Sequence, residues 1–384
     1  MPYMQHSFVL TRAFALQRLT HVLPRTGRAY ADGRDIDRGA EAEPSTTALS
    51  PWLRRRLLLE EEVIDAALAM HGPAAAGKFV EEVFWRSYFK GHLETHPSIW
   101  TDYLALTAQG QARLATQSGL RRVYEDAIAG RTGIDGFDHW ARQLVETGWL
   151  HNHARMWFAS IWIFTLRLPW ALGAEFFLRH LLDGDPASNT LSWRWVGGLH
   201  TRGKPYVARV ENIHRYTEGR FSPQHLDENP VPLEEEALHP ALPLQPADQA
   251  PRGEVALLLH LDDLHPESLM LGDARVVRVG GLMVHAPQAA EAVRRADEVA
   301  MTDALARAAA WFGCPAGLAT PGWEAGLPII TAWAPVGPSA AVLPAGCTRI
   351  RREWDSQVWP YATRGYFQVR KMIPACMKVP RHQS

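Results

Sequence analysis

The stretch TGWLHNHARMWFASIW, residues 147–162, sets polar and charged side chains into an otherwise aromatic and aliphatic run. On a helix, Asn152, Arg155 and Met156 fall at positions i, i+3 and i+4 and therefore share one face. A guanidinium buried on such a face requires an anionic partner, because an unpaired charge is costly in a protein interior. The stretch thus predicts a helix whose arginine takes part in an internal ion pair.

A candidate partner lies in the segment LLDGDPASNTLSWRW, residues 181–195. Here Asp183 and Asp185 stand beside a glycine and a proline that interrupt a helix. We predict that Arg155 pairs with Asp183. The alternative is that Arg155 makes an ordinary surface contact while both aspartates cap a helix. Spacing alone does not decide between these two interpretations.

Composition restricts the class of protein. The chain has 384 residues, 47% of them hydrophobic, which is enough for two or three domains with full cores. Because 40 Lys and Arg residues balance 41 Asp and Glu residues, the chain has no overall positive charge. A polyanionic partner such as a nucleic acid would therefore have to bind to a local basic patch. Arg12 and Arg18 interrupt the apolar N-terminal segment, which excludes a signal peptide, and the longest apolar run, 156–166, is too short to span a membrane. We expect a soluble, cytoplasmic protein.

The three cysteines are too few and too irregularly spaced for a disulfide framework or a four-cysteine metal or iron-sulfur site. We therefore expect no metal.

The chain changes character along its length. Over residues 8–220 apolar residues recur at intervals of three and four, which predicts an all-helical domain. Residues 221–253 are rich in proline and acidic residues and are predicted to be a linker. Residues 254–384 alternate strand patterns such as EVALLLHL with a long amphipathic helix that ends at Gly313, which predicts a small α/β domain. The predicted fold class is mainly α.

Four segments together resemble the FAD-binding helical domain of the DNA photolyase and cryptochrome family. In chain order they are STTALSPWL (45–53), KFVEEVFWRSYFKGHL (78–93), RTGIDGFDHWARQLVETGWLHNHARM (131–156) and LLDGDPASNTLSWRW (181–195). They cover about residues 10 to 220, and four motifs in the family's order make a chance similarity improbable.

The resemblance implies FAD as cofactor. A bent FAD buried among helices needs hydroxyl and amide donors at its phosphates and fixed hydrogen-bond partners at its flavin edge and adenine. The residues that match the family's cofactor positions are Tyr30, Thr46, Thr47, Leu49, Ser50, Arg86, Asn152, Arg155, Asp183, Asp185 and Asn189. Asn189 matches the position at flavin N5. An asparagine there accompanies repair enzymes in the family, whereas plant-type cryptochromes carry aspartate.

The resemblance also implies DNA containing pyrimidine dimers as substrate, with the lesion flipped out of the duplex. The residues that match the substrate positions are Glu82, Trp85, His153, Met156 and Trp195. Photolyases for the pyrimidine-pyrimidone lesion carry histidines where this chain has Asn152 and Met156, which favours the cyclobutane dimer. His153 replaces an arginine that contacts DNA phosphate in many photolyases, so we expect weaker DNA binding.

The three arginines 54–56 follow the first motif. One interpretation is that these arginines compensate for the positive charge lost at His153. The other is that at least two of them form a solvated helix face.

The 15 tryptophans suggest an electron relay to the flavin, although core packing explains most of them. Trp193 and Trp170 match the first two positions of the family's relay and, with Glu82, are the predicted catalytic residues. The third position holds Ala127, with Tyr124 one turn earlier as a substitute.

Three other functions compete with repair. The chief alternative is a cryptochrome-like light sensor that binds FAD without repairing DNA and whose C-terminal domain binds a protein partner. A flavoprotein with a purely structural cofactor is disfavoured by Glu82, Trp85 and Trp193. A nuclease suggested by the string HNH, residues 151–153, is disfavoured because the three residues are consecutive on one helix.

Because the resemblance starts near residue 10, we expect the chain to lack the family's usual N-terminal antenna domain. The tail WPYATRGYFQVRKMIPACM, residues 359–377, resembles the end of that domain, which suggests a relocated antenna-like domain at the C-terminus.

Overall fold

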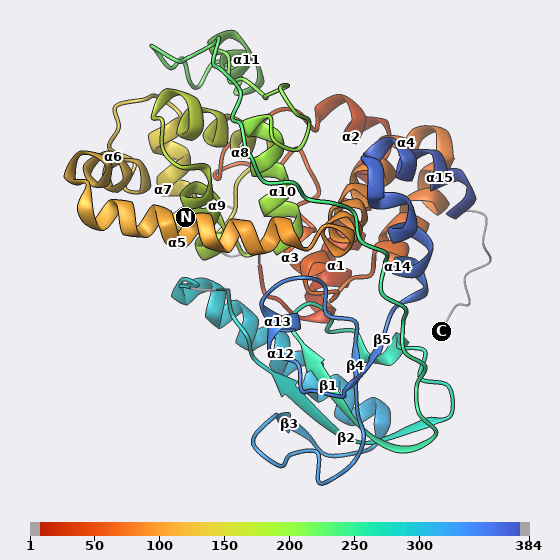
Figure 1. Ribbon diagram of the computed structural model, residues 1–384. Coiled ribbons are helices and arrows are strands. Elements are labelled where there is room, and N and C mark those ends of the chain that lie inside the picture. Colours follow the sequence, from red (N-terminus) through yellow and green to blue (C-terminus); the bar gives the residue numbers. More distant parts are fainter. Residues whose placement is uncertain (1–7, 287, 377–384) are drawn as a thin grey trace. The chain divides into compact units, whose positions relative to one another are not determined.

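The computed structural model describes residues 8–286 and 288–376 (Figure 1). They form two compact units, and each is described here by itself. The first contains residues 8, 29–48 and 98–239, and the second contains residues 9–28, 49–97 and 240–376. Two N-terminal stretches are thus grouped with the C-terminal sheet. The sequence division into 8–220, 221–253 and 254–384 remains a prediction.

The first unit is helical, as the spacing of apolar residues predicts. Its helices are α2 (Arg28–Gly33), α5 (Ser98–Thr116), α6 (Ser118–Ile128), α7 (Phe137–Thr147), α8 (Asn152–Ser160), α9 (Trp170–His180), α10 (Pro186–Gly197) and α11 (Val210–Tyr216). Helix α7 ends at Gly148, which has a left-handed φ of 68° that glycine adopts without strain.

Helix α8 is shorter than the opening stretch of sequence suggests. The α-helix ends at Ser160. A π turn, Ile161–Thr165, follows it directly and is closed by a hydrogen bond from Leu166 N to Ile161 O at 2.9 Å. Such π turns are inserted in helices at sites that need an altered side-chain direction. Pro169, which lacks an N–H, then precedes α9.

The helices of the second unit come from both ends of the chain. They are α1 (Arg12–Val22), α3 (Ser50–Arg54), α4 (Glu60–Thr95), α12 (Glu291–Phe312), α13 (Pro338–Ala341), α14 (Glu353–Val358) and α15 (Tyr366–Cys376), with short 3-10 turns at Leu23–Arg25, Pro266–Ser268 and Trp359–Arg364. A kink at Gly72, followed by Pro73, divides α4. Among the described residues, no helix of either unit is both long and apolar enough to cross a membrane.

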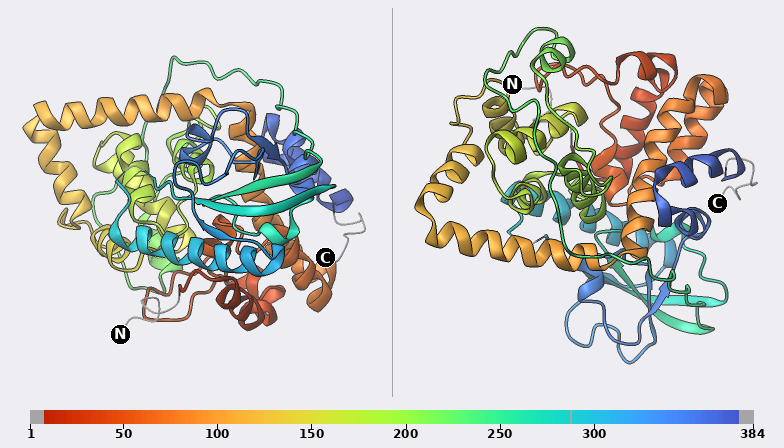
Figure 2. Two further views of the ribbon diagram at one scale, coloured as in Figure 1. Left: turned by 90° about the horizontal axis from the view of Figure 1, so that it is seen from below. Right: turned by 45° about the horizontal axis from the view of Figure 1, so that its top comes forward.

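The second unit also holds a sheet of five parallel strands in the order β3-β2-β1-β4-β5. The strands are β1 (Gly253–His260), β2 (Ala274–Leu282), β3 (Ala316–Leu318), β4 (Ile329–Ala332) and β5 (Thr348–Ile350). Six consecutive residues of β1 are buried, as expected for a central parallel strand. Helix α12 packs against β2 and β3 and ends at Gly313, as predicted (Figure 2). The predicted fold class, mainly α with a small α/β part, is confirmed.

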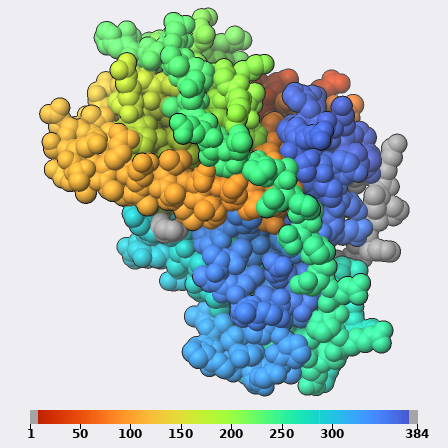
Figure 3. Space-filling model, in the orientation of Figure 1, coloured from red at the N-terminus to blue at the C-terminus, as the bar shows by residue number. Residues whose placement is uncertain are grey.

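The proline-rich segment 221–252 contains no helix and no strand. Most of its side chains are exposed or half-buried, and it is seen on the surface as an extended chain, coloured green in Figure 3.

Candidate functional site

Arg155 and Asp183 form the predicted ion pair in the first unit. Arg155 Nη2 lies 2.9 Å from Asp183 Oδ2, and Arg155 Nε donates to Leu150 O at 2.9 Å. The Asp183 side chain is only 3% exposed. The turn that carries Asp183 is held in place by the bond from Leu182 N to Gly148 O at 2.9 Å. The interpretation of Arg155 as an ordinary surface contact is therefore wrong.

Asp185 takes the capping role that the alternative gave to both aspartates. Its Oδ1 accepts a hydrogen bond from Ser188 N at 2.8 Å and so caps α10. One turn later, the buried Asn189 donates through Nδ2 to Ala174 O at 2.8 Å, which fixes its amide against α9. The loop and first turn of α10 thus present a paired carboxylate, a capping carboxylate and an anchored amide.

The segment with the predicted phosphate-binding hydroxyls lies beside the start of α8. Ser45 Oγ donates to Ile36 O at 2.6 Å and lies 3.3 Å from His151 Nε2. Ala48 is buried and packs against Trp149. The intervening residues Thr46 and Thr47 are held between these two contacts, so two motifs about 100 residues apart in the sequence come together.

Tyr30, another predicted cofactor residue, is buried in α2. The roles of Tyr30, Thr46 and Thr47 at a cofactor remain predictions.

His151 ties this segment to α8 and caps the helix. Its Nδ1 accepts from His153 N at 3.2 Å, and its Nε2 lies 3.0 Å from Arg34 O. A carbonyl can only accept, so this arrangement requires the neutral imidazole with its proton on Nε2. Burial lowers the pKa of His151 to about 4, and the charge of Asp37 opposes the shift only in part.

Acidification is expected to weaken the folded state through His151. Because its pKa is lower in the folded state than the value of about 6.5 for an exposed histidine, the unfolded chain binds the proton more readily. The stabilisation is complete above about pH 6.5 and is lost as the pH falls towards 4, by at most about 3 kcal/mol. His151→Asn keeps a capping side chain without this titration, so urea unfolding between pH 4.5 and 7.5 should show a flatter pH dependence.

His214→Asn, at an exposed histidine of α11, is the matched control and should keep the wild-type pH dependence. An unchanged slope in His151→Asn would contradict the assignment.

The predicted substrate residues of the first unit lie near the same helix start or on α10. Asn152, a predicted cofactor residue, is exposed, and its Nδ2 lies 3.6 Å from Sδ of the predicted substrate residue Met156. His153 stacks on Tyr216 with ring centroids 5.5 Å apart, and burial lowers its pKa, so it carries no positive charge at neutral pH. Trp195 stacks on Tyr206 at 5.5 Å.

The predicted relay tryptophans are both buried but have different neighbours. Trp193 meets Trp162 edge to face, with ring centroids 6.2 Å apart. Trp170 instead lies 5.8 Å from Tyr103. Sequence reasoning missed Trp162, because nothing in its spacing distinguishes it from a packing residue.

Helix α4 of the second unit carries Glu82, Trp85 and Arg86, all half-buried. Trp85 is stacked on Tyr366 of α15, with ring centroids 3.6 Å apart and an interplanar angle of 11°. The Tyr366 hydroxyl donates to Glu81 O at 2.8 Å. One face of the Trp85 indole is therefore covered by Tyr366.

Leu49 and Ser50 also belong to the second unit, at the start of α3. Leu49 is buried. Their part in cofactor binding, like that of Arg86, remains a prediction.

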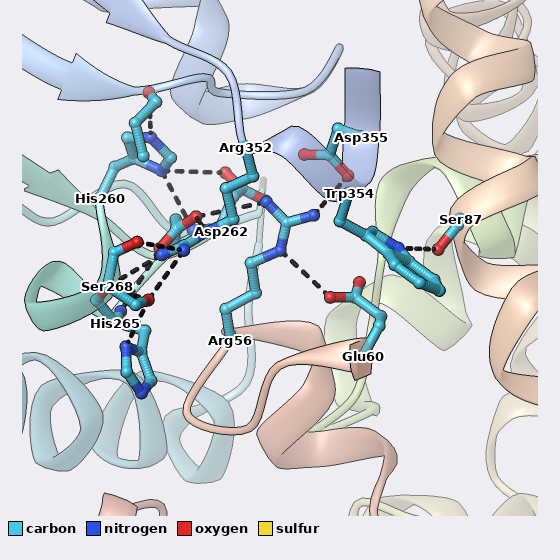
Figure 4. A network of polar contacts seen from close by, with 12 residues as sticks. Arg56, Glu60, Ser87, His260, Asp262, His265, Ser268, Arg352, Trp354 and Asp355 are labelled. Atoms are coloured by element: carbon cyan, nitrogen blue, oxygen red, sulfur yellow. Dashed lines mark hydrogen bonds and ion pairs between the residues drawn. The ribbon is translucent and has the colours of Figure 1, made fainter. Parts of the chain in front are cut away.

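Both expectations for the arginine run were wrong. Arg54 Nη1 lies 2.6 Å from Asp262 Oδ1, and Arg55 Nε lies 2.8 Å from Asp297 Oδ1. Arg56, 1% exposed, reaches Asp355 Oδ1 at 2.6 Å (Figure 4). The three arginines form neither a solvated face nor a patch for DNA, because each is paired with a carboxylate more than 200 residues later in the chain.

The network around Arg56 is larger than one pair. Asp263 accepts from Arg56 at 3.2 Å and from Arg352 at 2.6 and 2.7 Å, and Glu60 lies 3.4 Å from Arg56 Nε. Burial alone would raise the pKa of Asp263, but the positive charge of Arg352 outweighs burial and holds the pKa well below its usual range. Asp263 is therefore ionised at neutral pH.

The sheet's carboxyl edge is covered by the chain's own side chains. In parallel sheets, ligands commonly bind where the strand order reverses, here between β1 and β4. Glu94 of α4 accepts from Val336 N at 2.6 Å and from Trp333 Nε1 at 3.1 Å just beyond β4. Arg54 at the end of α3 and Arg56 just after it pair with the carboxylates that follow β1. Within the described ranges, no group of three or more His, Cys, Asp or Glu side chains is arranged to hold a metal.

Comparisons with known proteins agree with the sequence motifs. Residues 79–225 match the model described as the FAD binding domain of DNA photolyase. The chain is 33% identical over 180 residues to deoxyribodipyrimidine photo-lyase of Streptomyces griseus, which covers 46% of this chain and 36% of the relative. It is 30% identical over 175 residues to the Escherichia coli enzyme of that name, covering 43% and 33%. The chain thus spans about a third of the length of these relatives.

Two solved structures were also found. One is a bacterial class III photolyase from Agrobacterium tumefaciens, 25% identical, with a TM-score of 0.44 and coverage of 54% of this chain and 42% of that one. The other is a Synechocystis cryptochrome, 22% identical, with a TM-score of 0.45 and coverage of 55% and 45%. The matched model describes an FAD-binding domain. FAD is therefore the cofactor, as expected from the sequence. Over residues 79–225, the chain is thus similar to the FAD-binding domain of DNA photolyases.

Proposed function

We propose that the chain binds FAD and uses blue light to repair cyclobutane pyrimidine dimers in DNA by electron transfer from reduced flavin. The observation that carries the proposal is the Arg155–Asp183 pair, set beside the anchored Asn189 amide in the matched domain. These groups place a cation, an anion and an amide within one helical domain, and each can hydrogen-bond a polar ligand.

The donor set fits the chemistry of FAD. A flavin edge presents carbonyl acceptors and an N–H donor, and the guanidinium of Arg155 and the carboxylate of Asp183 offer both kinds of partner. Ser188 Oγ is buried and finds no hydrogen-bond partner among the described residues. Buried hydroxyls are normally satisfied, so a polar ligand beside α10 would complete this one. The hydroxyls of Thr46 and Thr47 suit the phosphates.

FAD, when bound, supplies the absorption of light and the electron for the lesion. The chain's own residues hold and orient the reactants. Arg155 and Asp183 orient the cofactor, and the uncharged Asn189 amide serves more than one protonation state of the flavin. Glu82, in its protonated form, donates a hydrogen bond to the carbonyl edge of the dimer, and the Trp85 indole face opposite Tyr366 stacks on the dimer.

A cryptochrome-like sensor is the second candidate, and three observations support it. His153 is neutral where many photolyases place an arginine, residues 54–56 are consumed in internal ion pairs, and Tyr366 covers one face of Trp85. All three lower the affinity expected for damaged DNA. In this alternative the sheet-containing part binds a protein partner, and a cytoplasmic location is expected for both candidates.

Illumination of the purified protein with a dimer-containing oligonucleotide tests the proposal. The protein should show flavin absorption bands and restore the dimer to pyrimidines, as measured by chromatography. Glu82→Gln should lower the repair rate about ten- to hundredfold, because a hydrogen bond to a developing charge contributes about 1.5 to 3 kcal/mol. Glu125→Gln, at an exposed residue of α6, should repair at the wild-type rate.

The outcomes separate the candidates. Flavin bands without repair would transfer the assignment to the sensor. A protein that stays colourless when FAD is supplied would refute both.

A further inference from the structure

Three aromatic rings of the first unit form a continuous row. Trp193 meets Trp162 edge to face at 6.2 Å and 86°, and Trp162 meets Tyr124 edge to face at 5.8 Å and 86°. Both separations lie within the range of direct aromatic contact, about 4.5 to 7 Å. Trp162 is fully buried, and the row runs between α10, the π turn after α8, and α6.

The contact between the two indoles depends on a glycine. A Cβ atom at Gly173 of α9 would lie 2.3 Å from Trp193 Cη2 and 2.9 Å from Trp162 Cε2. Any larger residue would push at least one ring away, so Gly173 provides the space in which both rings meet. Trp162 is also anchored by its Nε1, which donates to Pro169 O at 3.0 Å.

Tyr124, at the far end of the row, is built into a polar cluster. Its phenol is hydrogen-bonded to the Arg179 guanidinium and to the side chain of Gln111. Arg179 in turn contacts both carboxylate oxygens of Glu175, at 2.9 and 2.8 Å. Burial raises the pKa of Tyr124, and the Arg179 guanidinium that donates to the phenolic oxygen opposes this shift.

The branch through Trp170 leads to a different tyrosine. Trp170 lies 5.8 Å from Tyr103, and the Arg194 guanidinium 6.0 Å from the Trp170 ring centre is itself paired with Glu235 at 2.7 Å. A tyrosine that gives up an electron and its proton together becomes a neutral radical, so the Arg179 guanidinium does not oppose oxidation of Tyr124.

We propose that Tyr124 is the terminal electron donor of this chain and that Trp162 connects it to Trp193. The proposal rests on the proposed binding of FAD. Trp193 gives one electron to photoexcited oxidised flavin, Trp162 refills Trp193, and Tyr124 refills Trp162. Tyr124 thereby loses one electron, and its hydroxyl proton passes to water, so one electron and one proton leave the phenol for each electron gained by flavin.

Electron paramagnetic resonance of illuminated, rapidly frozen protein tests the route. Wild type should yield a neutral tyrosyl radical, and both Tyr124→Phe and Trp162→Phe should reduce that signal at least tenfold. Tyr103→Phe is the matched control, because Tyr103 is the tyrosine beside Trp170. It should keep the signal. Near-ultraviolet circular dichroism of the flavin-free variants, together with flavin absorbance after loading, shows that the fold and cofactor binding are intact.

Each result bears on the proposal. A tyrosyl signal that persists in Tyr124→Phe, or that disappears in Tyr103→Phe, overturns the route while leaving the proposed FAD function in place. Flavin bands without any tyrosyl radical also overturn the route alone. A protein that takes up no flavin overturns both the route and the proposed function.

Discussion

Replacing Arg56 by methionine is expected to destabilise the folded protein by about 3 to 5 kcal/mol, because three buried carboxylates lose their shared cation. Arg56 contacts Asp263, Asp355 and Glu60, and every one of these side chains is 1% exposed. Water cannot replace the guanidinium at such depth. Methionine matches the length of the side chain, so lost charge rather than lost volume dominates the effect.

Urea unfolding followed by circular dichroism measures the loss. The control is Arg121→Met on α6, where the arginine is half-exposed and lies 3.9 Å from Glu125. Exposed pairs of this kind contribute less than about 1 kcal/mol, so the control should unfold near the wild-type midpoint. If Arg56→Met lay within 1 kcal/mol of wild type, the cluster would not be an ionised network.

Features with short-range causes could be predicted from the sequence. The helices of the first unit follow from apolar residues spaced at three and four, and the end of α12 follows from Gly313. The Arg155–Asp183 pair spans only 28 residues and was inferred because a buried charge requires a partner. Each of these predictions needed only local pattern and the cost of an unpaired charge.

Features with distant causes could not be predicted. Nothing near residues 54–56 reveals that their carboxylate partners lie beyond residue 260, so a run of three arginines resembles a surface patch. The stacking of Tyr366 on Trp85 joins segments 281 residues apart. Strands β3 and β5 have three residues each, too few for an alternating pattern to be recognised.

The Arg155–Asp183 pair should prove essential to both folding and flavin binding. Arg155→Met removes the guanidinium partner of a carboxylate that is 3% exposed, so we expect a loss of about 2 to 3 kcal/mol in unfolding free energy. The partial exposure of Arg155, 24%, keeps this value below that for Arg56. FAD affinity should fall at least about tenfold, which corresponds to about 1.4 kcal/mol.

A double-mutant cycle separates the pair from its neighbours. Arg155→Met with Asp183→Asn removes both charges, so the double variant should be more stable than Arg155→Met alone, with a coupling energy of about 1 to 3 kcal/mol. Flavin affinity should nevertheless stay low, because the cofactor loses both polar partners. Arg122→Met, at an exposed arginine of α6, should change neither quantity. Additive effects on stability would show that the two residues act independently, and wild-type FAD affinity in Arg155→Met would remove Arg155 from the proposed cofactor site.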